Sequence, residues 1–287
     1  MIVSVSRRTD IPAFYSEWFF NRINEGFALV RNPMNHNQIR TVSLKAEDVD
    51  CIVFWTKNPR SIIPYLDKLN RYHFYFQFTL TPYGQDIEPG LPDKTEIMDT
   101  FKRLSDKLGT HRVMWRYDPI LLNEQYTVSY HVDHFSGIAR TLKSYTEKAT
   151  ISFIDFYSKT ERAMSQLGIE KINSEIKNDL AQQLAAIAHE NSLAIDACAE
   201  DIDLSPYGIT RARCIDGALI EKITGHPVDA PKDKSQRPEC GCAASVDIGA
   251  YNTCRHGCLY CYANNNQSVV LKNTENHHKL SPLLVDE

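Results

Sequence analysis

The sequence predicts an α/β fold on a parallel sheet, as a full or partial TIM-like (β/α) barrel. Short apolar runs alternate with helical patterns of about 10 or more residues over positions 1–200, as parallel strands joined by helices do. One run, 51–55, is wholly apolar, which is typical of a strand buried on both faces. Most runs end in polar residues, as the ligand-binding edge of such a sheet does.

The elements follow in order from the first strand, 2–6. A helix is predicted from Ala13, just after Pro12, to Gly26. An irregular hairpin is expected where 27–31 and 39–44 flank Asn32-Pro33-Met34-Asn35, and the strand at 51–55 is followed by a helix at 60–69. The pattern then repeats, with strands at 73–80, 111–117, 149–156 and 193–197 and helices at 94–108, 129–145 and about 173–190.

The C-terminal part completes this pattern. Residues 1–200 form the predicted barrel core, and 201–287 form a cysteine-rich segment that completes it. A seventh parallel strand is predicted at 245–249, beside the N-terminal one. The segment 227–238 is a polar, proline-containing connector, and the Asn-rich tail from Asn264 is expected to be loosely ordered. A doubly wound open sheet is the alternative, because periodicity alone does not show closure.

Composition narrows the class of protein. Hydrophobic residues make up 43% and charged residues 24%, and no stretch approaches the ~20 apolar residues of a membrane span. The N-terminus lacks the features of a secretory signal, so the eight cysteines indicate a reducing cytoplasm, where clustered thiols bind metals. The net charge of −4 gives no global field that attracts nucleic acid, and DNA binding is not favoured.

The most informative stretch is Cys254-Arg-His-Gly-Cys258-Leu-Tyr-Cys261. Three thiolates on one short irregular loop fit one face of a 4Fe–4S cubane, which leaves one iron without a protein ligand. The alternative is a zinc site with His256 or a remote residue as fourth ligand, although zinc sites more often use paired C-x2-C units.

This loop resembles the signature of the radical S-adenosylmethionine (SAM) superfamily. The resemblance implies that Cys254, Cys258 and Cys261 hold a 4Fe–4S cluster and that SAM chelates its open iron. It also implies that Tyr260, just before the third cysteine, contacts SAM. One-electron reduction, from a donor such as flavodoxin or ferredoxin, would cleave SAM to methionine and a 5′-deoxyadenosyl radical.

The position of the loop departs from that superfamily, which normally carries it after the first strand. Here it begins near the C-terminus, so the barrel is expected to be circularly permuted relative to radical SAM enzymes. The whole chain most resembles a family known as DUF1848, which carries a radical SAM-like cysteine cluster at the C-terminal end. That resemblance implies a cofactor class and no particular reaction.

Polar residues at the predicted strand ends are candidate ligands for SAM and substrate. The superfamily's Gly-Gly-Glu-Pro motif is absent, so other residues are needed. Arg116 is a candidate for the SAM carboxylate, and Asp118 or Asp155 for its ammonium or ribose hydroxyls. Any one of these could instead cap a helix or form a surface ion pair. The remaining strand-end candidates are Arg7 and Arg8 for cofactor binding and Lys159 and Glu200 for catalysis.

A second set of cysteines is predicted to bind metal. Its members are Cys198, Cys214, Cys240 and Cys242. Four thiolates are the complement of a saturated 4Fe–4S cluster or of a structural zinc site, and both remain open. Cys51, in an apolar strand, is expected to be an inert buried thiol.

The sequence therefore predicts a cytoplasmic radical SAM-type enzyme that abstracts hydrogen from a substrate it does not identify. One alternative is a DNA-repair enzyme like the spore photoproduct lyases, which share the C-x3-C-x2-C loop. Another is a zinc-binding protein without turnover.

Overall fold

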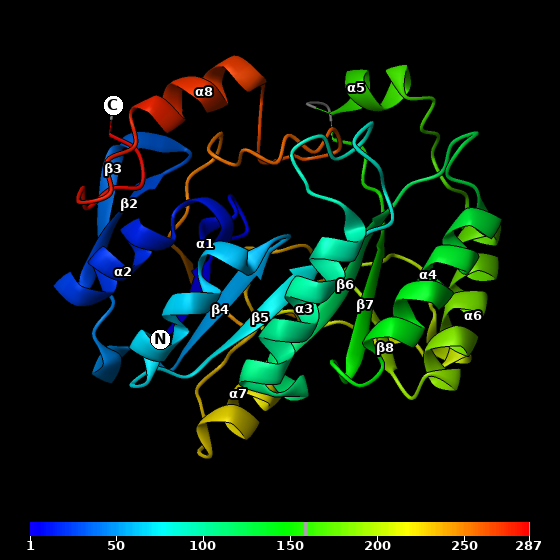
Figure 1. Cartoon of the computed structure of the whole chain (residues 1–287), viewed down its shortest axis with the longest axis horizontal. Helices are drawn as coiled ribbons and strands as arrows, with labels where there is room; N and C mark the ends of the chain where they lie inside the picture. Colours follow the sequence, from blue (N-terminus) through cyan, green and yellow to red (C-terminus); the bar gives the residue numbers. More distant parts are fainter. Residues whose placement is uncertain (158–159, 287) are drawn as a thin grey trace.

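A central sheet of eight parallel strands organises the structure, a computed structural model that describes residues 1–157 and 160–286 (Figure 1). The spatial order is β10-β1-β4-β5-β6-β7-β8-β9. The strands are β1 (Ile2–Val5), β4 (Cys51–Thr56), β5 (Phe74–Thr79), β6 (Val113–Ile120), β7 (Lys148–Phe153), β8 (Ala194–Ala197), β9 (Thr210–Arg211) and β10 (Val246–Asp247). From β1 to β9, neighbouring strands of the sheet are also consecutive along the chain, except that β2 and β3 form a separate hairpin. This order and the parallel pairing confirm the predicted parallel α/β class.

The sheet is open within the described residues. β9 and β10 form its two edges, and no pairing joins them, so closure of the predicted barrel is not observed. The predicted position of the C-terminal strand is confirmed, because Val246 of β10 pairs in parallel with Val3 of β1. Strands from 201–287 thus occupy both edges of a sheet whose centre is built by 1–200. The two-residue β9 was not predicted, since so short a run carries no periodicity.

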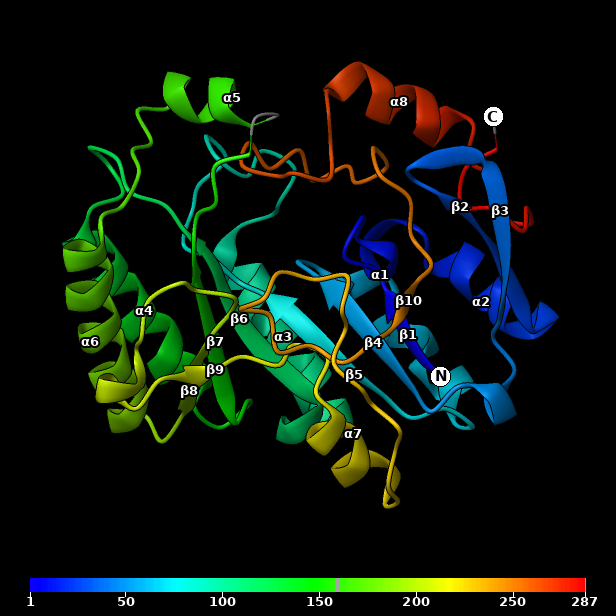
Figure 2. The ribbon, with the colours of Figure 1, turned by 180° about the vertical axis from the view of Figure 1, so that it is seen from behind.

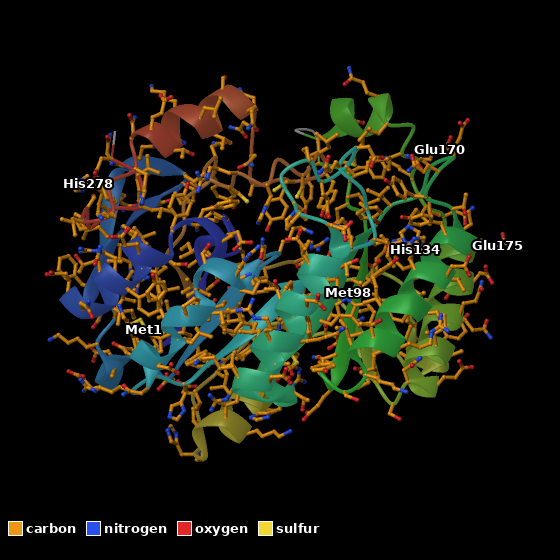
Figure 3. All side chains as sticks on the ribbon, viewed as in Figure 1. Met1, Met98, His134, Glu170, Glu175 and His278 are labelled. Atoms are coloured by element: carbon orange, nitrogen blue, oxygen red, sulfur yellow. The ribbon has the colours of Figure 1, made fainter. Side chains whose placement is uncertain are left out.

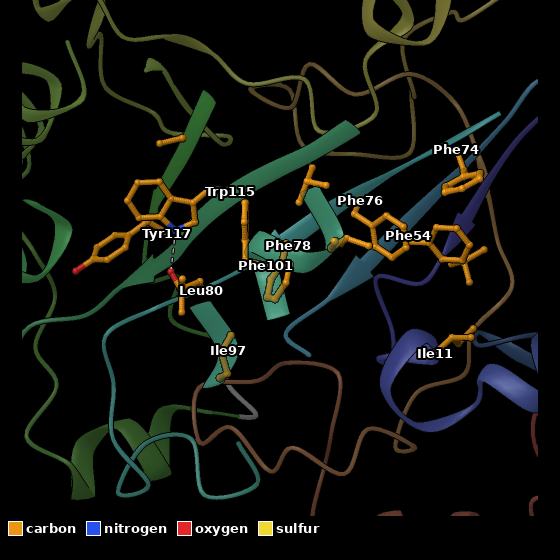
Figure 4. Packing of buried hydrophobic residues seen from close by; sticks show 14 of the residues in the cluster. Ile11, Phe54, Phe74, Phe76, Phe78, Leu80, Ile97, Phe101, Trp115 and Tyr117 are labelled. Atoms are coloured by element: carbon orange, nitrogen blue, oxygen red, sulfur yellow. Dashed lines mark hydrogen bonds between the residues drawn. The ribbon is translucent and has the colours of Figure 1, made fainter. Parts of the chain in front are cut away.

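One face of the sheet packs against helices. These are α1 (Ile11–Phe14), α2 (Ser16–Glu25), α3 (Lys94–Leu108), α4 (Val128–Leu142) and α6 (Ser174–Glu190). Alternate strand residues such as Phe54, Phe76 and Trp115 enter this core, and the Trp115 indole N–H donates to the Leu80 carbonyl at 3.0 Å (Figure 4). Their burial in a sheet sandwiched between layers explains the continuous apolar runs in the sequence.

The other face is covered by the segment 212–243, which includes α7 (Gly217–Thr224) and is visible in Figure 2. The strand residues that alternate with the first set, including Val53, Tyr75 and Met114, pack there against Ile215 and Ile220. The connector predicted at 227–238 is irregular except for a single bridge between Lys232 and Ala243. Residues C-terminal to the predicted core thus form one of the two layers on the sheet.

The structure confirms one prediction about local structure and corrects another. The hairpin is confirmed as β2 (Phe27–Asn32) and β3 (Asn35–Ser43). The helix predicted at 60–69 is instead two 3-10 helices, Pro59–Ser61 and Ile63–Leu69. Pro59 and Pro64 explain the difference. Proline has no backbone N–H to donate within a helix, so it is tolerated only at the first positions, and each of these prolines stands at the start of a separate short helix.

The tail is also more ordered than predicted. It contains α8 (Gln267–Glu275), and its last residues pack on α2: the Trp18 indole N–H donates to the carbonyls of Ser281 and Leu283 at 2.9 and 3.1 Å. His278 accordingly lies beside the hairpin, at the opposite end of the molecule from Glu170 and Glu175 (Figure 3). Among the described helices, none combines the length and the apolar character needed to cross a bilayer.

Candidate functional site

The loop with Cys254, Cys258 and Cys261 lies over the carboxyl ends of β1, β4 and β5. It lies on the same side of the molecule as α5 (Glu161–Gln166) and α8, opposite α7 (Figures 1 and 2). His256, at the centre of the loop, is buried, and its Nε2 lies 2.8 Å from Oδ2 of Asp10, which follows β1. The same Asp10 oxygen accepts the backbone N–H of Lys57, directly after β4, at 2.7 Å. One carboxylate therefore ties the cysteine loop to two strand ends.

Glu88, in the segment after β5, forms a second anchor. Glu88 is 1% exposed, and its carboxylate accepts hydrogen bonds from the Tyr260 hydroxyl, the Thr81 hydroxyl and the ammonium groups of Lys57 and Lys94. Burial opposes its ionisation, yet the two lysines lower the pKa of Glu88 to about 2. For the lysines, burial and the carboxylate act in opposite directions: the pKa of Lys57 is raised and that of Lys94 lowered. Glu88 is thus a buried carboxylate that holds Tyr260 in place.

The backbone of the loop fits closely against the same segment. The N–H of Gly90 donates to the carbonyl of His256 at 2.8 Å, and the N–H of Leu259 donates to that of Ile87 at 3.0 Å. A Cβ atom on Gly90 would lie 2.6 Å from the His256 oxygen. Only glycine permits this approach.

The three thiols of the loop share one electrostatic environment. Burial raises the pKa of Cys254 well above its usual value, and it raises that of Cys258 to about 12. Each of these two thiols also interacts with Cys261, while Lys57 favours the thiolates of Cys258 and Cys261. Buried thiolates need compensating positive charge. The donor set therefore suits a cationic metal centre.

A chain of charged groups leads from this loop to the second cysteine set. Lys57 interacts with Asp118, which in turn pairs with the guanidinium of Arg116. Arg116 also donates to the sulfur of Cys214 and lies over the ring of Trp55, 5.2 Å from its centroid. The cation next to Cys258 is thus Lys57. Arg116, which was predicted to bind the SAM carboxylate, instead forms an ion pair with Asp118 and a hydrogen bond with Cys214.

The structure brings Cys198, Cys214, Cys240 and Cys242 together. The sulfur of Cys214 lies 3.6 Å from that of Cys198, and the thiol of Cys242 is close enough to those of Cys214 and Cys240 to influence their pKa values. Hydrogen bonds from the side chain and the backbone N–H of Cys242 outweigh burial and lower the pKa of Cys240 to about 7. Cys51, in contrast, is buried in β4, and burial raises its pKa to about 12.

The other predicted site residues have local partners. Asp155 pairs with Arg237 at 2.6 Å, and Arg8 donates to the carbonyl of Gly249 at 3.3 Å. Glu200 accepts the backbone N–H of Phe153 at 2.8 Å and pairs with Lys177 at 3.1 Å.

The guanidinium of Arg7 lies over Trp55, 5.4 Å from the ring centroid, and its Nη2 is buried without a hydrogen-bond partner. Lys159 lies outside the described residues.

Neither cysteine set is arranged as a finished ligand shell. Within 1–157 and 160–286, no three histidine, cysteine, aspartate or glutamate side chains surround a point at which they could hold a metal ion as they stand. The Nε2 atom of His256, the alternative fourth ligand of a zinc site, is instead within hydrogen-bond distance of the Asp10 carboxylate. Both sets are therefore close groups of thiols whose side chains would have to converge on a metal.

Sequence reasoning missed Glu88 and Gly90 and did not single out Lys57 as the cation beside the thiols. Glu88 lies in an irregular stretch after β5, where nothing in the local pattern indicates burial. Its one signal is position, because it follows a strand whose carboxyl end faces the cysteine loop.

These features define an α/β protein with a loop of three half-buried thiols held over the carboxyl ends of its parallel strands. The family described as Domain of unknown function (DUF1848) matches residues 2–263, and the chain belongs to that family. Among curated proteins, none matches this chain.

Proposed function

We propose that this protein is a radical SAM-type enzyme whose 4Fe–4S cluster is held by Cys254, Cys258 and Cys261. The observation that carries the proposal is the position of three mutually interacting, half-buried thiols over the carboxyl ends of β1, β4 and β5. Parallel α/β proteins bind ligands at this edge. A cluster bound there with SAM would supply reductive cleavage of SAM and a radical able to abstract hydrogen.

The proposal extends to the fold, as a partial barrel circularly permuted relative to radical SAM enzymes. Its support is the strand order, in which chain neighbours are sheet neighbours and β10 precedes β1. The loop that follows β10 then stands where a loop after a first strand would stand. In this arrangement the sequence 201–287 supplies the metal-binding loop and 1–200 most of the substrate side.

The residues around the thiols fit defined roles. Lys57 provides positive charge next to Cys258 and Cys261, and Glu88 fixes Lys57 through a 2.7 Å ion pair. Glu88 also orients the Tyr260 ring, which is the proposed contact for the adenine of SAM. Burial of Glu88 and Tyr260 limits the access of water to this side of the loop.

The space between the two cysteine sets is the proposed substrate side. Asp118 and Arg116 connect Lys57 to Cys214 there, and Asp155 with Arg237 lies at a more exposed position beside it. Paired charges of this kind can hold a polar substrate by exchanging one partner for it.

The experiment is anaerobic reconstitution with iron and sulfide, followed by reduction with dithionite in the presence of SAM. The expected result is a brown protein that releases 5′-deoxyadenosine. The Cys254→Ala/Cys258→Ala/Cys261→Ala variant should release none, whereas Cys51→Ala, which alters a thiol remote from the loop, should behave as wild type. A colourless wild-type protein with zinc bound at the loop, or a brown one that leaves SAM intact, would overturn the proposal.

A further inference from the structure

The second cysteine set has a geometry of its own. Cys198 follows β8, Cys214 follows β9, and Cys240 and Cys242 flank Gly241 in the segment that covers the sheet. The sulfurs of Cys198 and Cys214 lie 3.6 Å apart, and the thiol of Cys242 is close enough to those of Cys214 and Cys240 to influence their pKa values. Three of the four side chains are buried. Residues distant in the sequence therefore bring four thiols into one neighbourhood, from which their side chains would converge on a metal ion.

The sulfur spacing distinguishes the metals that four thiols can bind. Zinc bound tetrahedrally by four sulfurs at about 2.3 Å holds them about 3.8 Å apart. The Cys198–Cys214 sulfur distance of 3.6 Å is close to this edge. A cubane cluster instead binds each thiolate at a different iron, with the cluster between them, so its ligands stand further apart.

The cysteine loop provides an internal comparison. Cys254, Cys258 and Cys261 interact electrostatically, but within the described chain no thiol–thiol hydrogen bond joins them. A direct sulfur–sulfur contact, between Cys198 and Cys214, is thus a feature of the second set. Contact of this kind suits ligands that share one small ion.

Donors to the sulfurs surround the second set. The backbone N–H of Ile215 donates to Cys242 and that of Cys242 donates to Cys240, while Arg116 donates to Cys214. Four thiolates around Zn²⁺ carry an excess of two negative charges, which such N–H groups and a guanidinium offset. Gly241 allows the chain to pass close to Ala212, since a Cβ on it would lie 2.9 Å from the carbonyl oxygen of that residue.

We propose that Cys198, Cys214, Cys240 and Cys242 bind a single Zn²⁺ ion as a structural tetrathiolate site, separate from the cluster loop. Binding replaces the Cys198–Cys214 hydrogen bond by four zinc–sulfur bonds, as the four side chains converge on the ion, and releases the thiol protons to solvent, with no change of oxidation state. The ion ties the end of β8 to the segment 212–243, which leads into β10 and the cysteine loop. The site does not depend on the proposed radical chemistry.

The test is metal analysis of full-length protein purified anaerobically from cells supplied with both iron and zinc. The Cys254→Ala/Cys258→Ala/Cys261→Ala variant is expected to retain a single zinc ion per chain and no iron. The Cys240→Ala/Cys242→Ala variant is expected to lose the zinc, and Cys51→Ala to keep it. Iron with acid-labile sulfide in the triple variant would overturn the proposal in favour of a second cluster.

A measurement on wild-type protein avoids dependence on a variant that fails to fold. Titration with a mercurial in the presence of a chromogenic chelator should release one zinc ion per chain, and cobalt added to the zinc-free protein should give the spectrum of tetrahedral sulfur coordination. Absence of releasable zinc, or a Cys198–Cys214 disulfide in peptide mapping, would overturn the zinc site. Loss of SAM cleavage alone would count against the proposed function and leave the zinc result unaffected.

Discussion

The hydroxyl of Tyr260 donates a hydrogen bond to the carboxylate of Glu88, 172 positions earlier in the chain. This bond joins the cysteine loop to the segment after β5. The same carboxylate neutralises Lys57 and Lys94, so it couples the position of the loop to the charge beside the thiols. Substitutions at Glu88 can therefore separate charge from simple packing.

Glu88→Gln is expected to lower the free energy of unfolding by about 3 kcal/mol, at the low end for a broken buried ion pair because Lys57 and Lys94 keep some solvent contact. The amide preserves the shape but leaves two ammonium groups without a counter-charge. Urea denaturation measures the stability, and iron content after reconstitution should fall in parallel.

Tyr260→Phe is the matched control for this variant. It removes one donor to the charged Glu88 carboxylate and keeps the ring, so the expected cost is about 2 kcal/mol. Equal losses in the two variants would mean that the charge of Glu88 contributes nothing beyond its hydrogen bond to Tyr260.

Gly90→Ala is expected to displace the cysteine loop. The added Cβ would meet the His256 carbonyl oxygen at 2.6 Å, and backbone atoms cannot rotate away as a side chain can. Iron incorporation should drop several-fold while the far-ultraviolet circular dichroism stays near that of wild type.

Gly137→Ala provides the control, because a Cβ at this position in α4 has no neighbouring atom within 4 Å. Alanine also favours a helix over glycine by about 1 kcal/mol, so this variant should be slightly more stable and bind iron normally. Normal iron binding by Gly90→Ala would show that the loop tolerates displacement.

Stability is expected to decline with acid because of His131. This buried residue contacts the Tyr117 hydroxyl and the Leu121 carbonyl, and burial lowers its pKa to about 4. The unfolded chain, with a histidine pKa near 6.5, takes up the proton first, so stability present above that pH is lost as pH falls from about 6.5 to about 4. A shift of this size corresponds to about 3 kcal/mol.

Urea denaturation across this pH range measures the effect. His131→Asn should flatten the pH dependence, whereas His134→Gln, at an exposed position four residues from Tyr130, should retain it. A wild-type pH dependence that His131→Asn leaves unchanged would assign the acid sensitivity to other groups.

The parallel strands were predictable because the central ones are rich in apolar residues that are buried on both faces, as Phe54 and Val53 illustrate in β4. The three thiols were predictable from their spacing. Features that depend on contacts between distant segments were not. The packing of the tail on Trp18, the burial of Glu88 and the two-residue β9 leave no periodic signal in the local sequence.

The tail is expected to be held by Trp18, which is fully buried in α2. Its indole N–H donates to two tail carbonyls, and the nearby Arg22 donates to that of Leu280 at 3.0 Å. Trp18→Phe keeps an aromatic ring but removes the donor and part of the packed volume. Backbone amides of 276–286 should therefore exchange with deuterium several-fold faster, as measured by mass spectrometry.

Trp115→Phe is the matched control, since the Trp115 indole N–H donates to the Leu80 carbonyl in the core (Figure 4). The same change of side chain there should raise exchange around β5 and β6 and leave the tail at its wild-type rate. If Trp18→Phe left exchange in the tail unchanged, the contacts of Ser281 and Leu283 with the indole would not be what orders it. Order in the tail would then rest on α8, whose Asn273 side chain donates to the Asn252 carbonyl at 3.0 Å.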